Sequence, residues 1–136
     1  MACVEELSVQ ARSRGLYEFT DLVARCVREA AIETGLCTLF VRHTSASLTI
    51  QENADPSARQ DLEQWIDRLA PERDPLYTHT AEGPDDMPAH IKAALTATSL
   101  SIPIVRGQLA LGTWQGIYLW EHRTAAPTRT VVVHIG

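Results

Sequence analysis

The spacing of apolar and polar residues changes several times along the first half of the chain. Residues 3–12 alternate weakly, so they predict a first strand that leads into a turn at 14–15. From Thr20, which can act as an N-cap, apolar residues recur at helical spacing, and Gly35 is a suitable stop for this helix. Residues 36–50 are rich in Leu, Val, Thr and Ile and therefore predict a strand, interrupted by a short polar stretch.

A second helix has the clearest boundaries in the sequence. Asp55 is placed to cap it, Pro56 fits the first helical position, and Pro71 follows its end. One stripe along this helix is apolar and consists of Ala58, Leu62, Trp65, Ile66 and Leu69. Residues 70–86 contain three prolines and predict a loop that is long for a compact domain, which favours a functional role.

A third helix is predicted after this loop. Asp85 or Asp86 would cap it, and Pro88 lies in its first turn. The residues expected on its buried side are Met87, Ile91, Ala94, Leu95 and Thr98. His90 and Lys92 flank that stripe.

The last third of the chain changes to strand-like spacing. The runs with this spacing are Leu100 to Val105, Leu109 to Leu111, Trp114 to Trp120 and Thr130 to Ile135. Consecutive strands joined by short turns favour antiparallel pairing. We therefore expect one α+β domain over residues 1–136, with about three helices packed on a mainly antiparallel sheet.

Composition narrows the functional classes. The 136 residues are 45% hydrophobic and 21% charged, which suits one folded domain. The formal net charge of −5 argues against a non-specific nucleic-acid binder, because such a protein needs a basic face. The three cysteines form no C-x-x-C pair, and the sequence shows neither a signal peptide nor an apolar run of membrane-spanning length. We therefore expect a cytoplasmic protein with no nucleic-acid or membrane partner.

Acidic residues are concentrated in 51–90, which holds ten of the 17 carboxylate side chains. His79 and His90 lie in the same stretch, and the carboxylates between them are Glu82, Asp85 and Asp86. Two imidazoles with nearby carboxylates are a sensible ligand set for zinc or another divalent ion, provided that the loop folds back. The spacing matches no known zinc signature, so two exposed histidines in a solvated acidic loop are the alternative.

His43 ends a predicted strand and begins a cluster of hydroxyls that includes Ser45 and Ser47. Hydroxyls and backbone donors in such a turn can hold a phosphate, or they can simply satisfy local backbone groups. Glu52 lies at a strand end, where a carboxylate can act as a general base or a metal ligand. Asp55 already has a structural role as a helix cap.

Two glycines surround Trp114 and Gln115 in a further motif. The indole and the amide could stack on a heteroaromatic ring and read its edge, or Trp114 could be a core residue of a tight hairpin. Glu121 and Arg123 follow at the end of the same strand, with His122 on the opposite face by alternation. An exposed, ion-paired strand end is the alternative for these three residues.

Three ordered motifs resemble the YjbQ-like family of secondary thiamine-phosphate synthases. They are residues 43–56 (HTSASLTIQENADP), 79–92 (HTAEGPDDMPAHIK) and 112–117 (GTWQGI). The similarity extends nearly end to end, from residue 13 to the terminal strand. Gln51 and Thr80 depart from the family pattern, which has Asn and an acidic residue at these positions.

The resemblance implies a YjbQ-like fold that assembles as a homotrimer, with sites near the subunit contacts. It also implies a weak or secondary activity that joins hydroxymethylpyrimidine pyrophosphate to thiazole phosphate and releases pyrophosphate. A divalent metal ion, zinc or magnesium, would be held by His79 and His90. The catalytic positions that it implies are His43, Glu52, Asp55 and Glu121, and those that would bind the phosphorylated substrate are Ser45, Ser47, Lys92, Trp114, Gln115 and Arg123.

The implied reaction makes modest demands on the protein. A displacement at the pyrimidine methylene needs positive charge at the departing pyrophosphate and stacking of the ring, with little need for a protein nucleophile. The same donors would suit a phosphoester hydrolase that activates water. A metabolite-binding trimer without turnover is the third interpretation.

Overall fold

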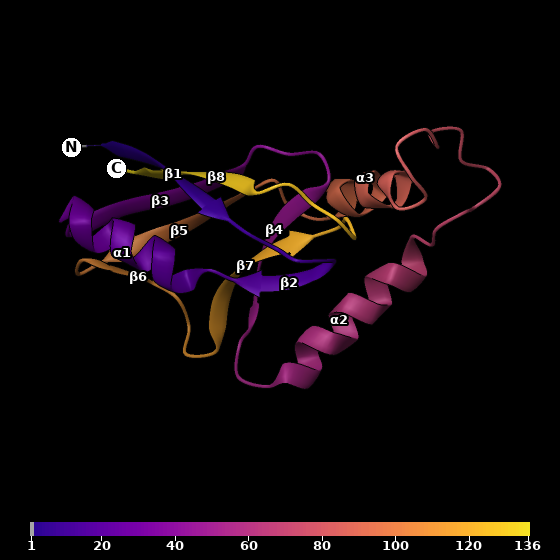
Figure 1. Cartoon of the computed structure of the whole chain (residues 1–136). Helices are drawn as coiled ribbons and strands as arrows, with labels where there is room; N and C mark the ends of the chain where they lie inside the picture. The colour runs from indigo at the N-terminus through magenta and orange to yellow at the C-terminus, as the bar shows by residue number, and fades with distance from the viewer. Residues whose placement is uncertain (1) are drawn as a thin grey trace.

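The computed structural model describes residues 2–136, and eight strands in this part of the chain form two antiparallel sheets (Figure 1). The five-stranded sheet has the order β1-β8-β3-β5-β6, with β1 (Cys3–Val9), β8 (Arg129–Ile135), β3 (Thr34–Val41), β5 (Ser99–Val105) and β6 (Gln108–Leu109). The three-stranded sheet has the order β2-β7-β4, with β2 (Gly15–Glu18), β7 (Gln115–Glu121) and β4 (Ala46–Glu52). Three helices complete the domain, so the α+β prediction is confirmed.

One apolar core joins the two sheets. Alternation along β3 points Cys37, Leu39 and Val41 inward, and each of them is almost completely buried. Leu48 of β4 and Leu119 of β7 reach the same cluster from the second sheet. Helix α1 (Thr20–Ala30) covers this core with Val23, Cys26 and Val27, which follow helical spacing. Strand alternation and one helical stripe therefore account for most of the buried apolar surface.

The ends of α1 differ from the prediction. The Thr20 hydroxyl does not cap the helix; it donates to Glu18 and accepts the backbone N–H of Ile117. The helix ends at Ala30 because Ala31 adopts the left-handed conformation, with φ of 54°. Gly35 lies inside β3 and does not end the helix.

Helix α2 (Pro56–Leu69) begins where predicted, and few of its side chains are buried against the rest of the domain. The Asp55 carboxylate accepts the backbone N–H of Ser57 at 2.9 Å, and Pro56 occupies the first turn. Within the described residues 2–136, Ile66 is the one residue of α2 that is fully buried. Its side chain packs on the three-stranded sheet. Trp65 and Leu69 are about half exposed, and the helix stands at the side of the two sheets (Figure 1).

Helix α3 (Asp86–Leu95) follows the predicted loop but buries another face than expected. The residues predicted on its buried side are partly or fully exposed, and Leu95 is 60% exposed. The buried face consists of Asp86, Pro88, Ala89 and Lys92. Ion pairs made by Asp86 and Lys92 orient the helix, so the apolar stripe does not decide which face turns inward. No helix within residues 2–136 has both the length and the apolar character needed to span a bilayer.

Candidate metal centre

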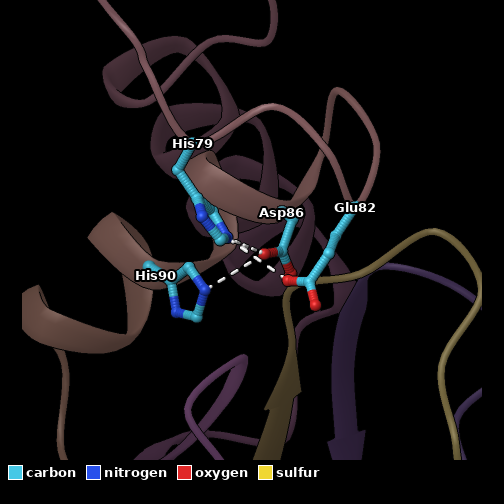
Figure 2. Close-up of side chains that lie close together, drawn as sticks. All are labelled: His79, Glu82, Asp86 and His90. Carbon is cyan, nitrogen blue, oxygen red and sulfur yellow. Dashed lines mark hydrogen bonds and ion pairs between the residues drawn. The ribbon is translucent and has the colours of Figure 1, made fainter.

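Four donor side chains meet where the loop after α2 returns to the start of α3 (Figure 2). His79 and Glu82 come from the loop, and Asp86 and His90 come from α3. The spacing of four residues places Asp86 and His90 on one face of the helix. One ligand atom from each of the four side chains lies within 4.8 Å of all the others. The predicted folding back of the loop therefore occurs.

Asp86 is the centre of this cluster. Its Oδ2 atom lies 2.6 Å from Nε2 of His79 and 3.1 Å from Nε2 of His90. Glu82 Oε2 lies 3.3 Å from Nε2 of His79. Both imidazoles therefore point the same nitrogen toward acidic oxygens (Figure 2).

Arg123 supports the cluster from behind. Its Nη1 donates to Oδ1 of Asp86 at 2.6 Å, and its Nε donates to Oδ2 of Asp85 at 3.0 Å. Nη2 also donates to the backbone carbonyl of Glu82 at 3.0 Å. One planar guanidinium thus fixes the loop and both aspartates, which leaves Oδ2 of Asp86 free to face the imidazoles.

These contacts set the charge of the cluster. Burial raises the pKa of Asp86, but the hydrogen bond from His79 and the charge of Arg123 outweigh it, and the net pKa is lowered. Burial is likewise outweighed at Asp85, where Thr124 and Arg123 lower the pKa to about 2. The hydrogen bond to Asp86 raises the pKa of His79. The aspartates are therefore anionic at neutral pH, and Arg123 and His79 are the groups that face their charge.

His90 provides a test of whether a metal ion fits. Its Nδ1 lies 3.2 Å from the backbone carbonyl oxygen of Thr44, and its Nε2 faces the Asp86 carboxylate. Both partners can only accept hydrogen bonds. Each ring nitrogen of His90 thus faces an acceptor, and a cation shared between Nε2 and Asp86 would resolve the contact at that nitrogen. An imidazole that donates Nδ1–H to a carbonyl and presents Nε2 is the usual arrangement of a metal-bound histidine.

The distances also suit a metal ion. Ligands about 2.0 to 2.2 Å from a tetrahedral ion lie roughly 3.3 to 3.6 Å from one another. The donor separations here begin at 2.6 Å and none exceeds 4.8 Å, so small side-chain movements would complete the site. The side chains of His79 and His90 are 44% and 33% exposed, which leaves the site open to a substrate or water.

An open groove of about 760 Å³ adjoins His90. His43 and Ser45 line it together with apolar side chains such as Val41 and Ala46. Nε2 of His43 accepts the backbone N–H of Thr130 at 2.9 Å, so its proton lies on Nδ1. Burial, with the charge of Arg129, lowers the pKa of His43, and the ring is neutral at pH 7. The predicted residues His43, Ser45 and His90 therefore share one surface.

Glu121 has a structural role at the end of β7. Its Oε1 accepts from Nε of Arg129 at 2.6 Å, and its Oε2 accepts from Nη2 of Arg129 and from the backbone N–H groups of His122 and Arg123. Both carboxylate oxygens are occupied inside the protein. The alternative of an exposed, ion-paired strand end is therefore wrong as to exposure, since Glu121 and His122 are each only 1% exposed, although Glu121 and Arg123 do form ion pairs.

Ser47 and Lys92 lie away from the groove. Oγ of Ser47 is 2.9 Å from Nε2 of His122, and Nζ of Lys92 donates to Asp67 at 2.6 Å. Both side chains are buried under α2, on the other face of the three-stranded sheet from the apolar core. Within one chain, neither residue shares a surface with the four metal donors.

The remaining predicted residues lie at the opposite end of the three-stranded sheet. The register pairs Ala46 with Glu121 and Glu52 with Gln115, so six residues, or about 20 Å, separate the two ends. Glu52 accepts the backbone N–H of Asp55. Gln115 accepts the backbone N–H of Gly112 at 2.7 Å, and the Trp114 side chain is 64% exposed. One chain therefore does not bring Glu52, Asp55, Trp114 and Gln115 to the metal donors.

Two features of the site were missed by sequence reasoning. The Thr44 carbonyl that orients His90 leaves no signal, because every residue carries a carbonyl group. The helical spacing of Asp86 and His90 is visible in the sequence and could have indicated that Asp86 is the shared partner.

Comparison with known proteins agrees with the fold and with the family that the motifs indicated. A family model described as UPF0047 protein YjbQ-like matches residues 5–136. The UPF0047 protein sll1880 of Synechocystis sp. is 52% identical over 131 residues, covering 96% of this chain and 89% of that protein. YjbQ of Escherichia coli O157:H7 is 42% identical over 127 residues, covering 93% and 91% of the two chains. The crystal structure of a YbjQ-like protein of unknown function from Sulfolobus solfataricus has a TM-score of 0.90 at 25% identity, covering 99% of this chain and 96% of that one. The chain therefore belongs to the UPF0047 YjbQ-like family.

Proposed function

We propose that the protein is a metal-dependent enzyme that acts on a small phosphorylated metabolite, with His79, Glu82, Asp86 and His90 as the metal donors. The observation that carries this proposal is the environment of His90, which faces a hydrogen-bond acceptor at both ring nitrogens. Two imidazoles with two carboxylates suit zinc better than magnesium, which prefers oxygen ligands. The groove beside His90 provides room for a substrate of metabolite size.

The reaction that we propose is secondary thiamine-phosphate synthesis. A bond forms between the thiazole nitrogen and the pyrimidine methylene, while the bond from that methylene to the pyrophosphate oxygen breaks. A bound divalent ion would supply positive charge for the departing pyrophosphate. Arg123 holds Asp86 and Glu82 in place for this task, and the neutral His43 can donate its Nδ1 proton to a phosphate oxygen in the groove. Ser45 lines the same wall.

We also propose that the protein works as a trimer in the cytoplasm. Large apolar side chains are exposed on one chain, among them Phe40, Trp65, Leu69 and Trp114. A neighbouring subunit that covers some of them could bring Trp114 and Gln115 to a groove from which they are distant within one chain. The three cysteines form no disulfide, which suits a reducing compartment. A monomeric mass in multi-angle light scattering would contradict the assembly.

Metal content and synthase activity together test the enzyme proposal. We expect about one divalent ion per purified chain. The double variant His79→Ala/His90→Ala should lose the ion and the formation of thiamine phosphate. His134→Ala is the matched control, because His134 is exposed on β8 and distant in sequence from the cluster. An unchanged metal content in the double variant would refute the metal site.

A phosphoester hydrolase is the second candidate. It is favoured by the exposure of His79 and His90, which leaves space for a water molecule at the site. Release of inorganic phosphate from a panel of phosphorylated metabolites, without thiamine phosphate formation, would support the hydrolase. Thermal stabilisation by such metabolites without any turnover would support a binding protein instead.

A further inference from the structure

A polar cavity lies between α2 and the three-stranded sheet. Its volume is about 330 Å³, and it is separate from the groove beside His90. Lys92 of α3 and His122, which follows β7, line it, together with Arg14, Gln64 and Trp120. None of these residues has a function in the proposed metal site, so the cavity requires its own explanation.

Two of the lining side chains are buried with unused hydrogen-bonding capacity. Lys92 and His122 are each only 1% exposed. The Lys92 ammonium carries three N–H donors, and within residues 2–136 its one side-chain partner is Asp67 Oδ1 at 2.6 Å. Nε2 of His122 is paired with Ser47, whereas Nδ1 has no partner in the described part of the chain. Buried polar atoms without partners are rare in folded proteins, which points to a missing ligand or ordered water.

Each carboxylate of the cavity wall already accepts at least one hydrogen bond. Glu63 Oε2 accepts the backbone N–H of Leu16 at 2.7 Å, and the oxygens of Glu121 are bound by Arg129 and by backbone donors. Asp67 is bound to Lys92, but its side chain is 43% exposed and lies 4.0 Å from Arg14 Nη1. A ligand could therefore replace Asp67 at Lys92, because Asp67 can move to Arg14.

The cavity offers free buried donors from Lys92, and a further one from His122 in one of its two tautomers. Two N–H bonds of Lys92 remain, and Nδ1 of His122 carries a proton when the Ser47 hydroxyl donates to Nε2. Burial, together with the charges of Lys92 and Arg129, lowers the pKa of His122 to about 3, so the ring is neutral and carries one proton. Lysine and imidazole donors gathered in a small desolvated space favour an acceptor with several oxygens.

We propose that this cavity binds a small oxyanion, the phosphate or carboxylate group of a metabolite, through Lys92 and His122. The cavity volume is at the lower end for small-molecule sites, so the ligand is compact. Binding needs no metal ion and does not depend on the proposed enzymatic function. The ligand would contact both α2 and the sheet, and it would therefore strengthen the loose attachment of this helix.

Titration of chelator-treated protein with inorganic phosphate and, separately, with acetate tests the proposal. We expect saturable calorimetric binding of at least one anion, and the anion that binds more tightly identifies the source of the oxygens. Addition of that anion should shift the Nδ1 resonance of His122 in nitrogen-15 spectra. Lys92→Met should weaken binding by about 30-fold, because the buried charge is lost. The double variant His79→Ala/His90→Ala should bind as tightly as the wild type.

A second pair of variants guards against misfolding of Lys92→Met. Gln64 is an exposed residue at the cavity wall, and Gln64→Glu should weaken anion binding several-fold through charge repulsion. Arg68→Gln makes the same change in net charge on α2 outside the cavity wall, so it should leave binding unchanged. Absence of saturable binding of either anion to the wild type would overturn the proposal. An unchanged anion affinity in Gln64→Glu would also overturn the proposal. So would a loss of anion binding in His79→Ala/His90→Ala.

Discussion

The two-sheet core and the segment from α2 through α3 are held together in different ways. The core is built from alternating apolar residues such as Leu39, Leu48 and Leu119, and all three are fully buried. The α2–α3 segment buries few apolar side chains and is positioned mainly by charged contacts, in which Arg123 holds Asp86 and Lys92 holds Asp67. Apolar packing thus stabilises the fold, and directional polar contacts position the candidate sites.

Truncation of a core leucine should have the largest effect on stability. Leu39→Ala removes a fully buried side chain from β3, and we expect the free energy of unfolding to fall by about 3 kcal/mol. Leu95→Ala is the matched change in α3, where the side chain is 60% exposed, and it should cost less than about 0.5 kcal/mol. Urea unfolding monitored by circular dichroism measures both. Equal losses of unfolding free energy in the two variants would show that apolar packing stabilises the core and α3 to the same extent.

Loss of Arg123 should produce the next largest effect. Arg123→Met leaves Asp85 and Asp86 without their cationic partner, and we expect a loss of about 2 to 3 kcal/mol. Arg25→Met removes an exposed pair with Glu29 at 4.0 Å, and it should change stability by less than about 0.5 kcal/mol. The same urea experiment compares the two variants. A neutral Arg123→Met would show that polar contacts do not position the α2–α3 segment.

The core and the cap of α2 were predictable because their signals are local. Period-two alternation along β3 and helical spacing along α1 specify which side chains turn inward, and Asp55 with Pro56 marks the start of α2. The buried face of α3 was not predictable from its apolar stripe. Asp86 and Lys92 face inward there because their partners, Arg123 and Asp67, are distant in sequence.

The candidate site was predictable only in part. His79 and His90 share a short acidic stretch, so their meeting could be expected from proximity along the chain. The predicted common site of His43, Ser47 and Glu52 does not form within one chain, because neighbouring side chains on a strand face opposite sides and the two ends of β4 are far apart. Ser47 turns toward His122 under α2, whereas Glu52 lies at the far end of β4.

Acid should destabilise the protein through Asp85. The pKa of this carboxyl is lowered from 3.8 to about 2 in the folded protein, where Thr124 and Arg123 outweigh the effect of burial. A lowered pKa stabilises the fold above the ordinary value, and this stabilisation is lost as pH falls from about 4 to 2. It amounts to about 2 kcal/mol. Urea midpoints measured across this range should therefore fall more steeply for the wild type than for Asp85→Asn, and parallel curves would contradict this role.

The smallest effect is expected at Asp55, where the capping role and the predicted catalytic role can be separated. Asp55→Ala removes the acceptor for the Ser57 backbone N–H, so amide exchange in the first turn of α2 should accelerate while the core remains protected. Asp55→Asn keeps an acceptor at the same position and should restore that protection. If the carboxylate also takes part in catalysis, Asp55→Asn will lose synthase activity despite its intact cap. If Asp55 only caps the helix, Asp55→Asn will keep the activity of the wild type, and the α2 terminus will belong to the structural part of the molecule.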